Sequence, residues 1–243
     1  MNKTYLKNLY TLLEKLENTQ EEIVDQVAAV CADCIEKGGL LYFFGTGHSH
    51  MIAEEPFYRA GGLACVYPIL ETDLMLHEGA SKSSGYERLE GLGNLVVANA
   101  GLGKGDVLFI ASNSGRNSAV IDAALEAKKR GAVTVAITSM NHTTQVASRH
   151  SSGFNLYQVC DYVLDNCGEV GDASVELPGM SQKIAPTSSV MDVTLVNLIL
   201  VNTVELLLQR GIQPPVFMSA NTDAGDNANK AVLKQYKGRI PSL

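Results

Sequence analysis

The stretch DVLFIASNSGRN, residues 106–117, decides the fold of this chain. It reads as a short buried strand that breaks into hydroxyls, an amide and a glycine, and a helix is predicted to follow from Asn117 to Arg130. A strand that enters a helix through such a loop points free backbone N–H groups and the positive end of the helix dipole at one spot, and that geometry binds phosphate. An ordinary turn after a parallel strand is the alternative. The loop residues that we expect to contact the ligand are Ser112, Asn113, Ser114, Gly115 and Asn117.

A second loop of the same character ends the stretch LLYFFGTGHS, residues 40–49, and precedes a helix that is predicted from Met51 to Arg59. The common nucleotide-binding loops do not fit, because the sequence lacks the pattern ending in Gly-Lys-Ser/Thr and His50 stands where a dinucleotide fingerprint has its third glycine. A nicotinamide or flavin site, with Glu71 or Asp73 on the ribose, remains a minor alternative. The candidate ligand-binding residues here are Thr46, Gly47, His48, Ser49 and Arg59.

Together the two loops resemble those of the sugar isomerase (SIS) family, whose members bind phosphosugars. The family pairs a Gly-x-Gly-x-Ser loop after the first strand with a Ser-x-Ser-Gly-x-Thr/Asn loop after a later one, and residues 45–49 and 112–117 match these patterns. The stretch GAVTVAITS, residues 131–139, is also typical of these domains. The resemblance covers roughly residues 35–210 and is closest to stand-alone proteins labelled phosphoheptose isomerases. It implies a flavodoxin-like three-layer fold and a phosphorylated sugar as the ligand.

Apolar strand-like runs alternate with helical patterns along the middle of the chain, which predicts an α/β fold with a five-stranded parallel sheet flanked by helices. We divide the chain into an N-terminal helical segment (1–37), a phosphosugar-binding domain (38–210) and a C-terminal arm (211–243) with a helix near Asn227–Tyr236. In the first segment two helical runs are expected, separated by a capping box of Thr19 and Glu22. The predicted strands are Leu40–Phe44, Ala64–Pro68, Val107–Ser112, Val133–Thr138 and Tyr162–Asp165, and the long site-forming loops are 72–86 and 166–187.

The composition excludes several classes of protein. A net charge of -7 argues against broad nucleic-acid binding, which requires a basic face. The N-terminus has no signal-peptide core, so we expect a cytoplasmic protein, and five cysteines without paired spacing fit a reducing compartment. The apolar segment Ser189–Leu208 carries Asp192 and Glu205, which are costly in lipid, and is therefore predicted to be a buried core helix rather than a membrane span.

Isomerisation of a sugar phosphate needs a base that moves a proton between adjacent carbons and an acid that assists ring opening. By their position near the two loops, Glu55, His77 and Glu78 are the predicted catalytic residues. The resemblance implies a glutamate base ten positions after the first-loop serine, but Arg59 stands there, and Glu55 lies one turn earlier. An exposed ion pair between Glu55 and Arg59 is the alternative role for these two side chains.

Two further groups of polar residues are candidate ligand contacts. Lys82 and Ser83 lie in the loop after the second strand, where an ordinary solvated loop is the alternative. The other group, Thr187, Ser188 and Ser189, precedes the long apolar helix, and helix capping is its alternative role.

Neither a metal ion nor a cofactor is expected. His48, His50 and Glu54 are suitable ligand types, but residues at i and i+2 do not share a helix face. The leading hypothesis is a phosphosugar-binding protein that isomerises an aldose to a ketose. A non-catalytic sensor, and a lyase or deaminase acting on an amino-sugar phosphate, are the alternatives. We expect a homodimer or homotetramer in which 77–84 or the tail 219–229 reaches a partner's phosphate loop.

Overall fold

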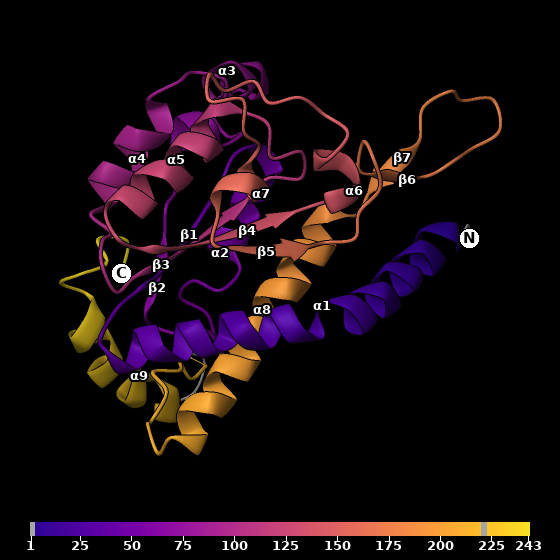
Figure 1. Ribbon diagram of the computed structural model, residues 1–243. Coiled ribbons are helices and arrows are strands. Elements are labelled where there is room, and N and C mark those ends of the chain that lie inside the picture. Colours follow the sequence, from indigo (N-terminus) through magenta and orange to yellow (C-terminus); the bar gives the residue numbers. More distant parts are fainter. Residues whose placement is uncertain (1–2, 220–222) are drawn as a thin grey trace.

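A computed structural model of the protein describes residues 3–219 and 223–243. Its centre is a parallel five-stranded sheet in the order β2-β1-β3-β4-β5, which confirms the predicted fold class (Figure 1). The strands begin and end within two residues of their predicted limits. They are β1 (Leu41–Gly45), β2 (Val66–Pro68), β3 (Val107–Ala111), β4 (Val133–Thr138) and β5 (Tyr162–Asp165).

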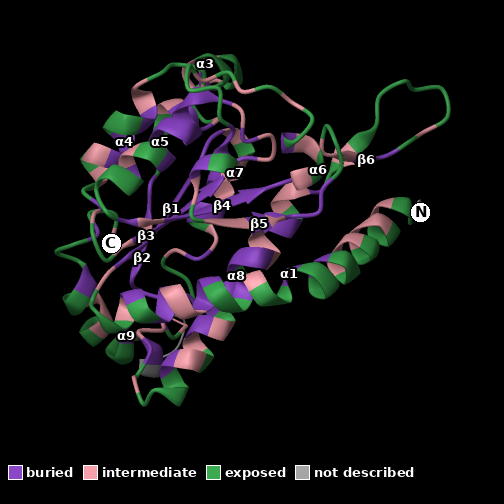
Figure 2. Ribbon diagram, in the orientation of Figure 1, coloured by how far each residue is buried: buried purple, intermediate pink, exposed green. Residues whose placement is uncertain are grey.

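The sheet is covered on both faces, so its central strands are continuously apolar (Figure 2). On one face lie α4 (Leu92–Ala100), α5 (Ser118–Lys129) and α7 (Leu156–Val159); on the other lie α1 (Thr4–Glu36) and α8 (Ser188–Gln209), which pack against each other (Figure 1). Every residue of β1 and β3 is buried, and the rings of Phe43 and Phe109 stack with their centroids 4.6 Å apart. This core holds the loops at the strand ends in fixed positions.

Two helix predictions were wrong. The N-terminal segment is one 33-residue helix, α1, in which Thr19 donates its hydroxyl to the carbonyl of Lys15 instead of starting a second helix. No glycine or proline lies between residues 4 and 36, so nothing in the sequence ends the helix. The helix expected to reach Arg59 stops early, as η1 (Gly47–His50) followed by α2 (Met51–Glu54), because Pro56 has no N–H to donate to the preceding turn.

The two long loops contain short elements. The first holds η2 (Thr72–Leu74) and α3 (Ala80–Tyr86). The second follows α6 (Met140–Thr143), α7 and β5, and includes an antiparallel pair, β6 (Ala173–Val175) and β7 (Ile184–Pro186). The chain ends with α9 (Asp223–Tyr236). Within the described residues, α8 is the one helix long and apolar enough to cross a membrane, but it packs in the domain as the predicted core helix, with Met191, Leu195 and Ile199 buried.

The strand order reverses direction between β1 and β3. β1 and β3 are neighbours and lie in register, with Gly45 opposite Ala111, yet β1 connects onward to β2 and β3 connects onward to β4. The loops after β1 and β3 therefore diverge to opposite sides. Ligands of open α/β sheets bind at such a reversal point, outside the carboxyl ends of the strands.

Candidate functional site

The two loops that the sequence singled out lie at this reversal point. Residues 46–50 follow β1, and residues 112–117 follow β3 and enter α5. The structure therefore brings the two loop sets of candidate residues to the same edge of the sheet.

The loop before α5 leaves hydrogen-bond donors free. Ser112 accepts from the N–H of Gly115 at 3.2 Å, and this tight turn puts Gly115 at φ +59°. A side chain there would meet Thr143 and Leu156, so a glycine is needed. Among the described residues, the backbone N–H groups of Ser114, Arg116 and Asn117 have no acceptor. Open donors at the start of a 12-residue helix suit an anion.

Three arginines gather around this helix N-terminus. Arg149 donates to the side chain of Asn117 at 2.8 Å, and its backbone N–H donates to the carbonyl of Arg116, also at 2.8 Å. Desolvation lowers the pKa of Arg149, the neighbouring charges of Arg116 and Arg88 lower it further, and the carboxylate of Glu87 partly opposes them. In the part of the chain that the structure describes, none of the three pairs with a carboxylate within 4 Å. Each of the three arginines lies in a stretch that the sequence singled out as polar, but sequence reasoning did not predict that they come together.

The first loop is fixed by contacts with its surroundings. The buried hydroxyl of Thr46 donates to Glu87 at 2.8 Å, and the N–H of Ser49 donates to the carbonyl of Thr46. His48 is exposed and Gly47 and Ser49 are half-buried, so these predicted contact residues remain accessible.

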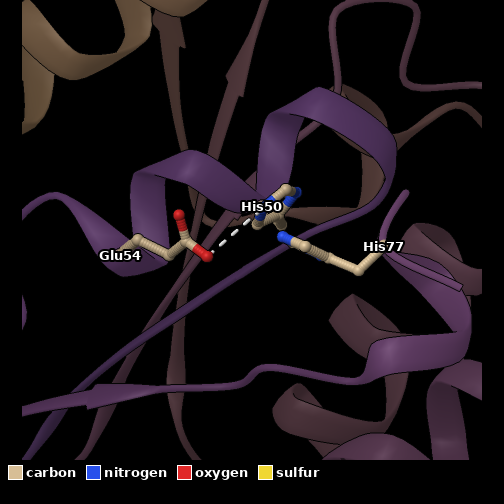
Figure 3. A group of neighbouring side chains, drawn as sticks. All are labelled: His50, Glu54 and His77. Carbon is tan, nitrogen blue, oxygen red and sulfur yellow. Dashed lines mark ion pairs between the residues drawn. The ribbon is translucent and has the colours of Figure 1, made fainter.

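His50, Glu54 and His77 form a compact cluster beside the first loop (Figure 3). His50 Nε2 lies 3.4 Å from Glu54 Oε1, and the rings of His50 and His77 meet edge to face with centroids 5.4 Å apart. His50 is buried, whereas Glu54 and His77 are exposed. Sequence reasoning considered His50 and Glu54 but paired them with His48, because the distance of 27 positions to His77 gives no local signal.

The other predicted catalytic carboxylates have partners elsewhere. Glu55 pairs with Arg59, as the alternative proposed, and also accepts from the side chain of Asn197 on α8 at 3.4 Å. Glu78 pairs with Lys82 at 2.9 Å, and this bond is the main cause that lowers the pKa of Glu78.

Lys82 and Ser83, the predicted ligand contacts on α3, also have protein partners. Lys82 additionally contacts Asp73. Ser83 is buried and donates to the carbonyl of Leu74 at 2.9 Å. The Lys82 ammonium and the Ser83 hydroxyl therefore stabilise the segment that carries them.

The N-terminus of α8 is capped by its own chain. One oxygen of Asp172 accepts from the N–H groups of Thr187 and Ser188 at 3.0 and 2.8 Å, and the other accepts from the Ser188 hydroxyl at 2.6 Å. The expected self-capping by Thr187 or Ser188 was therefore wrong: Thr187 is the N-cap residue, but its buried hydroxyl bonds to nothing. Ser189 is half-buried beside it.

A chain of side-chain amides connects α8 to the loop before α5. Asn166 donates to Asp192 on α8 at 2.8 Å and to Asn113 in the loop at 3.0 Å. Burial raises the pKa of Asp192 to about 7, although the hydrogen bond from Asn166 lowers it. Neither Asn166 nor Asp192 was predicted to act at the site.

Comparison with known proteins places the chain among relatives of the same fold. It is 42% identical to a UPF0309 protein of Thermoanaerobacter pseudethanolicus over 98% of each chain, and 40% identical to one of Geobacillus sp. over 100% of this chain and 98% of that one. A phosphoheptose isomerase from Neisseria gonorrhoeae shares the fold at 16% identity, with a TM-score of 0.57 over 82% of this chain and 95% of that chain. The Vibrio vulnificus NanR protein, solved with ManNAc-6P, also shares the fold, at 15% identity. Its TM-score is 0.50 over 98% of this chain and 68% of that chain. The SIS domain itself matches residues 4–139, and the protein is therefore a member of the SIS domain family.

Proposed function

We propose that this protein binds a phosphorylated sugar between the loops after β1 and β3 and isomerises it between aldose and ketose. The observation that carries the proposal is the N-terminus of α5, where unpaired N–H groups face the same region as three arginines without carboxylate partners. A dianionic phosphate would satisfy both the dipole and the guanidinium charges. Solved structures of the same fold include phosphoheptose isomerases and a protein holding a phosphosugar, which supports the same ligand class.

The proposed contacts follow from the accessible groups. Ser112, Ser114, Asn117 and Ser49 would hold the phosphate, and the acid and base for proton transfer would come from Glu55, His77 and Glu78. Of these three, His77 lies in the cluster closest to the first loop, through its contact with His50. Glu55 would act only after leaving Arg59 or with its carboxylate positioned by that arginine.

The experiment is a panel of sugar phosphates screened by thermal shift, with the matching unphosphorylated sugars as controls, and NMR of the best ligand over time. We expect stabilisation by phosphorylated sugars alone, followed by interconversion of the aldose and ketose signals. Glu55→Gln should then slow turnover by about 10²–10⁴-fold, the usual contribution of a positioned acid or base, while the ligand still binds. No stabilisation by any sugar phosphate would contradict the proposal.

A non-catalytic phosphosugar sensor is a second candidate, favoured by the arginine at the expected base position and by the ion pair that occupies Glu55. The same NMR experiment separates the two, because a sensor binds the sugar phosphate without changing it. Lyase or deaminase chemistry would instead release a second product.

We also propose that the protein works as a homodimer or homotetramer. The N-terminal part of α1 extends beyond the domain beside the β6–β7 pair, to which Tyr5 and Asn8 hydrogen-bond (Figure 1). On α8, Val201 and Leu208 expose 64% and 56% of their surface, which an oligomer interface would cover. The tail proposed to reach a partner lies partly outside the described residues, and its Asn229 binds Met218 of the same chain. Light scattering at micromolar concentration should give at least twice the mass of one chain.

A further inference from the structure

The cluster of His50, Glu54 and His77 has the composition and spacing of a metal site. The potential ligand atoms of the three side chains all lie within 4.8 Å of one another. His50 and Glu54 lie one helical turn apart, which explains why these two meet, but His77 joins them from the loop after η2. Figure 3 shows the two imidazoles and the carboxylate converging on one point.

The distance between two of these side-chain atoms fits tetrahedral coordination. Two atoms bound to zinc at 2.0–2.1 Å and separated by the tetrahedral angle lie about 3.3–3.4 Å apart. His50 Nε2 and Glu54 Oε1 are 3.4 Å apart. This separation is longer than a good charged hydrogen bond between nitrogen and oxygen, which is typically about 2.7–2.9 Å.

The orientation of the His50 ring is fixed by its second nitrogen. His50 Nδ1 contacts the carbonyl oxygen of Gly47, and because a carbonyl only accepts, Nδ1 carries the hydrogen. Nε2 is then directed at the carboxylate of Glu54. A backbone carbonyl that orients the distal nitrogen is also the usual outer-shell partner of a metal-bound histidine.

We propose that His50, Glu54 and His77 bind one divalent transition-metal ion, with zinc the best match. A proton shared by His50 and Glu54 would explain that pair alone, whereas a metal ion also explains why His77 joins them. Two imidazoles and one carboxylate are a ligand set of catalytic zinc sites, which keep a fourth position for water or substrate. Because Glu54 and His77 are exposed, solvent can reach that position.

The ion would lie next to the loop that ends β1, since His50 is bonded to Gly47 of that loop. If the proposed function holds, on which this step rests, the open position would take a sugar oxygen, and the ion would polarise the carbonyl as a Lewis acid. His48 and His50, the histidine pair nearest in sequence, do not form the cluster; His77 takes the place of His48 in the structure.

The test uses the metal alone, so that its result does not depend on any sugar. The full-length protein is stripped with a chelator and titrated with Co²⁺, whose visible spectrum reports tetrahedral coordination, and Zn²⁺ is then added in competition. We expect one Co²⁺ per chain, displaced by Zn²⁺. Glu54→Gln and His77→Ala, both at exposed side chains, should weaken binding by more than about 100-fold, beyond the 10–100-fold typical for losing an outer-shell partner.

Matched variants make the result specific. Glu55→Gln changes the neighbouring glutamate, which pairs with Arg59, and His142→Ala removes an imidazole outside the cluster; both should bind Co²⁺ as the parent protein does. Circular dichroism checks that each variant is folded. The proposal is overturned if the parent protein binds no stoichiometric Co²⁺, if His77→Ala binds it unchanged, or if the spectrum shows thiolate ligands. If the protein binds a sugar phosphate but no metal, the metal-site proposal fails and the proposed function still holds.

Discussion

The N-termini of α5 and α8 both carry small polar residues, but they differ in whether their backbone N–H groups are free to bind a ligand. At α5 the backbone donors of the preceding loop are unpaired and arginines surround them. At α8 the carboxylate of Asp172 already occupies two backbone donors and the Ser188 hydroxyl. The same dipole is therefore satisfied from within the chain at one helix and left open at the other. Whether a helix N-terminus binds a ligand depends on whether the chain supplies its own anion.

The largest expected effect comes from making α5 resemble α8. Ser114→Asp adds a carboxylate where the phosphate is proposed to bind, and two like charges about 4 Å apart repel by about 4 kcal/mol near a protein surface. Sugar-phosphate affinity should fall by more than about 100-fold, while the helix gains about 0.3–1 kcal/mol of stability from its dipole. Calorimetric titration and urea unfolding measure the two effects, and Ser114→Asn is the uncharged control. Retained affinity in Ser114→Asp would place the phosphate elsewhere.

Removing a single hydroxyl at each helix N-terminus should change sugar-phosphate affinity by a smaller amount. Ser114→Ala should weaken sugar-phosphate binding by about 1–3 kcal/mol, the cost of losing a hydrogen bond to a charged group. Ser188→Ala is the matched variant at α8 and should leave the affinity unchanged, because its hydroxyl is bonded to Asp172. Equal losses in both variants, measured by calorimetry, would show that both helix ends contact the ligand.

For folding stability we expect the reverse: the variant at α8 should cost more than the variant at α5. Asp172→Ala removes the acceptor of two backbone donors and should lower the free energy of unfolding by about 1–2 kcal/mol, as loss of a helix cap does. Asn117→Ala, at the start of α5, should cost less in the ligand-free protein, since the Asn117 side chain accepts from Arg149 and caps no amide of its helix. Urea denaturation of both variants decides this, and an equal cost would mean that Asp172 is not the cap of α8.

The smallest effect is expected at Thr187. Its hydroxyl is buried without a partner, so Thr187→Val, which keeps the shape and removes the unsatisfied group, should change stability by less than about 1 kcal/mol, in the stabilising direction. Ligand affinity should not change. A loss of affinity in this variant would reveal that the hydroxyl serves the ligand instead of the fold.

The sheet was predictable because its strands are continuous apolar runs between loop signals, as parallel strands buried on both faces must be. The loop before α5 was predictable because strand, loop and helix N-terminus are contiguous in sequence. The contacts of Asp172 with α8, of Arg149 with Asn117, and of the predicted residue His77 with His50 were not predictable. Each of these residues reaches its partners from another loop, and their distances along the chain carry no periodic signal. The break after Glu54 could have been predicted from Pro56, which the predicted helix Met51–Arg59 ran through.

If the proposed phosphosugar binds beside Asn113, the amide chain from Asn113 to Asp192 should couple its binding to proton uptake. Burial holds the pKa of Asp192 at about 7, so this carboxyl is partly protonated near neutrality and its raised pKa costs folding stability as the pH rises from about 4 to 7. An anion arriving beside Asn113 raises that pKa further, because like charges disfavour ionisation. Binding should therefore take up protons at neutral pH, visible as a binding enthalpy that depends on the ionisation enthalpy of the buffer, and the affinity should decline as the pH rises above 7. Asn166 would thus couple the protonation of Asp192 on α8 to the charge of a ligand at α5, although α8 itself would not contact that ligand.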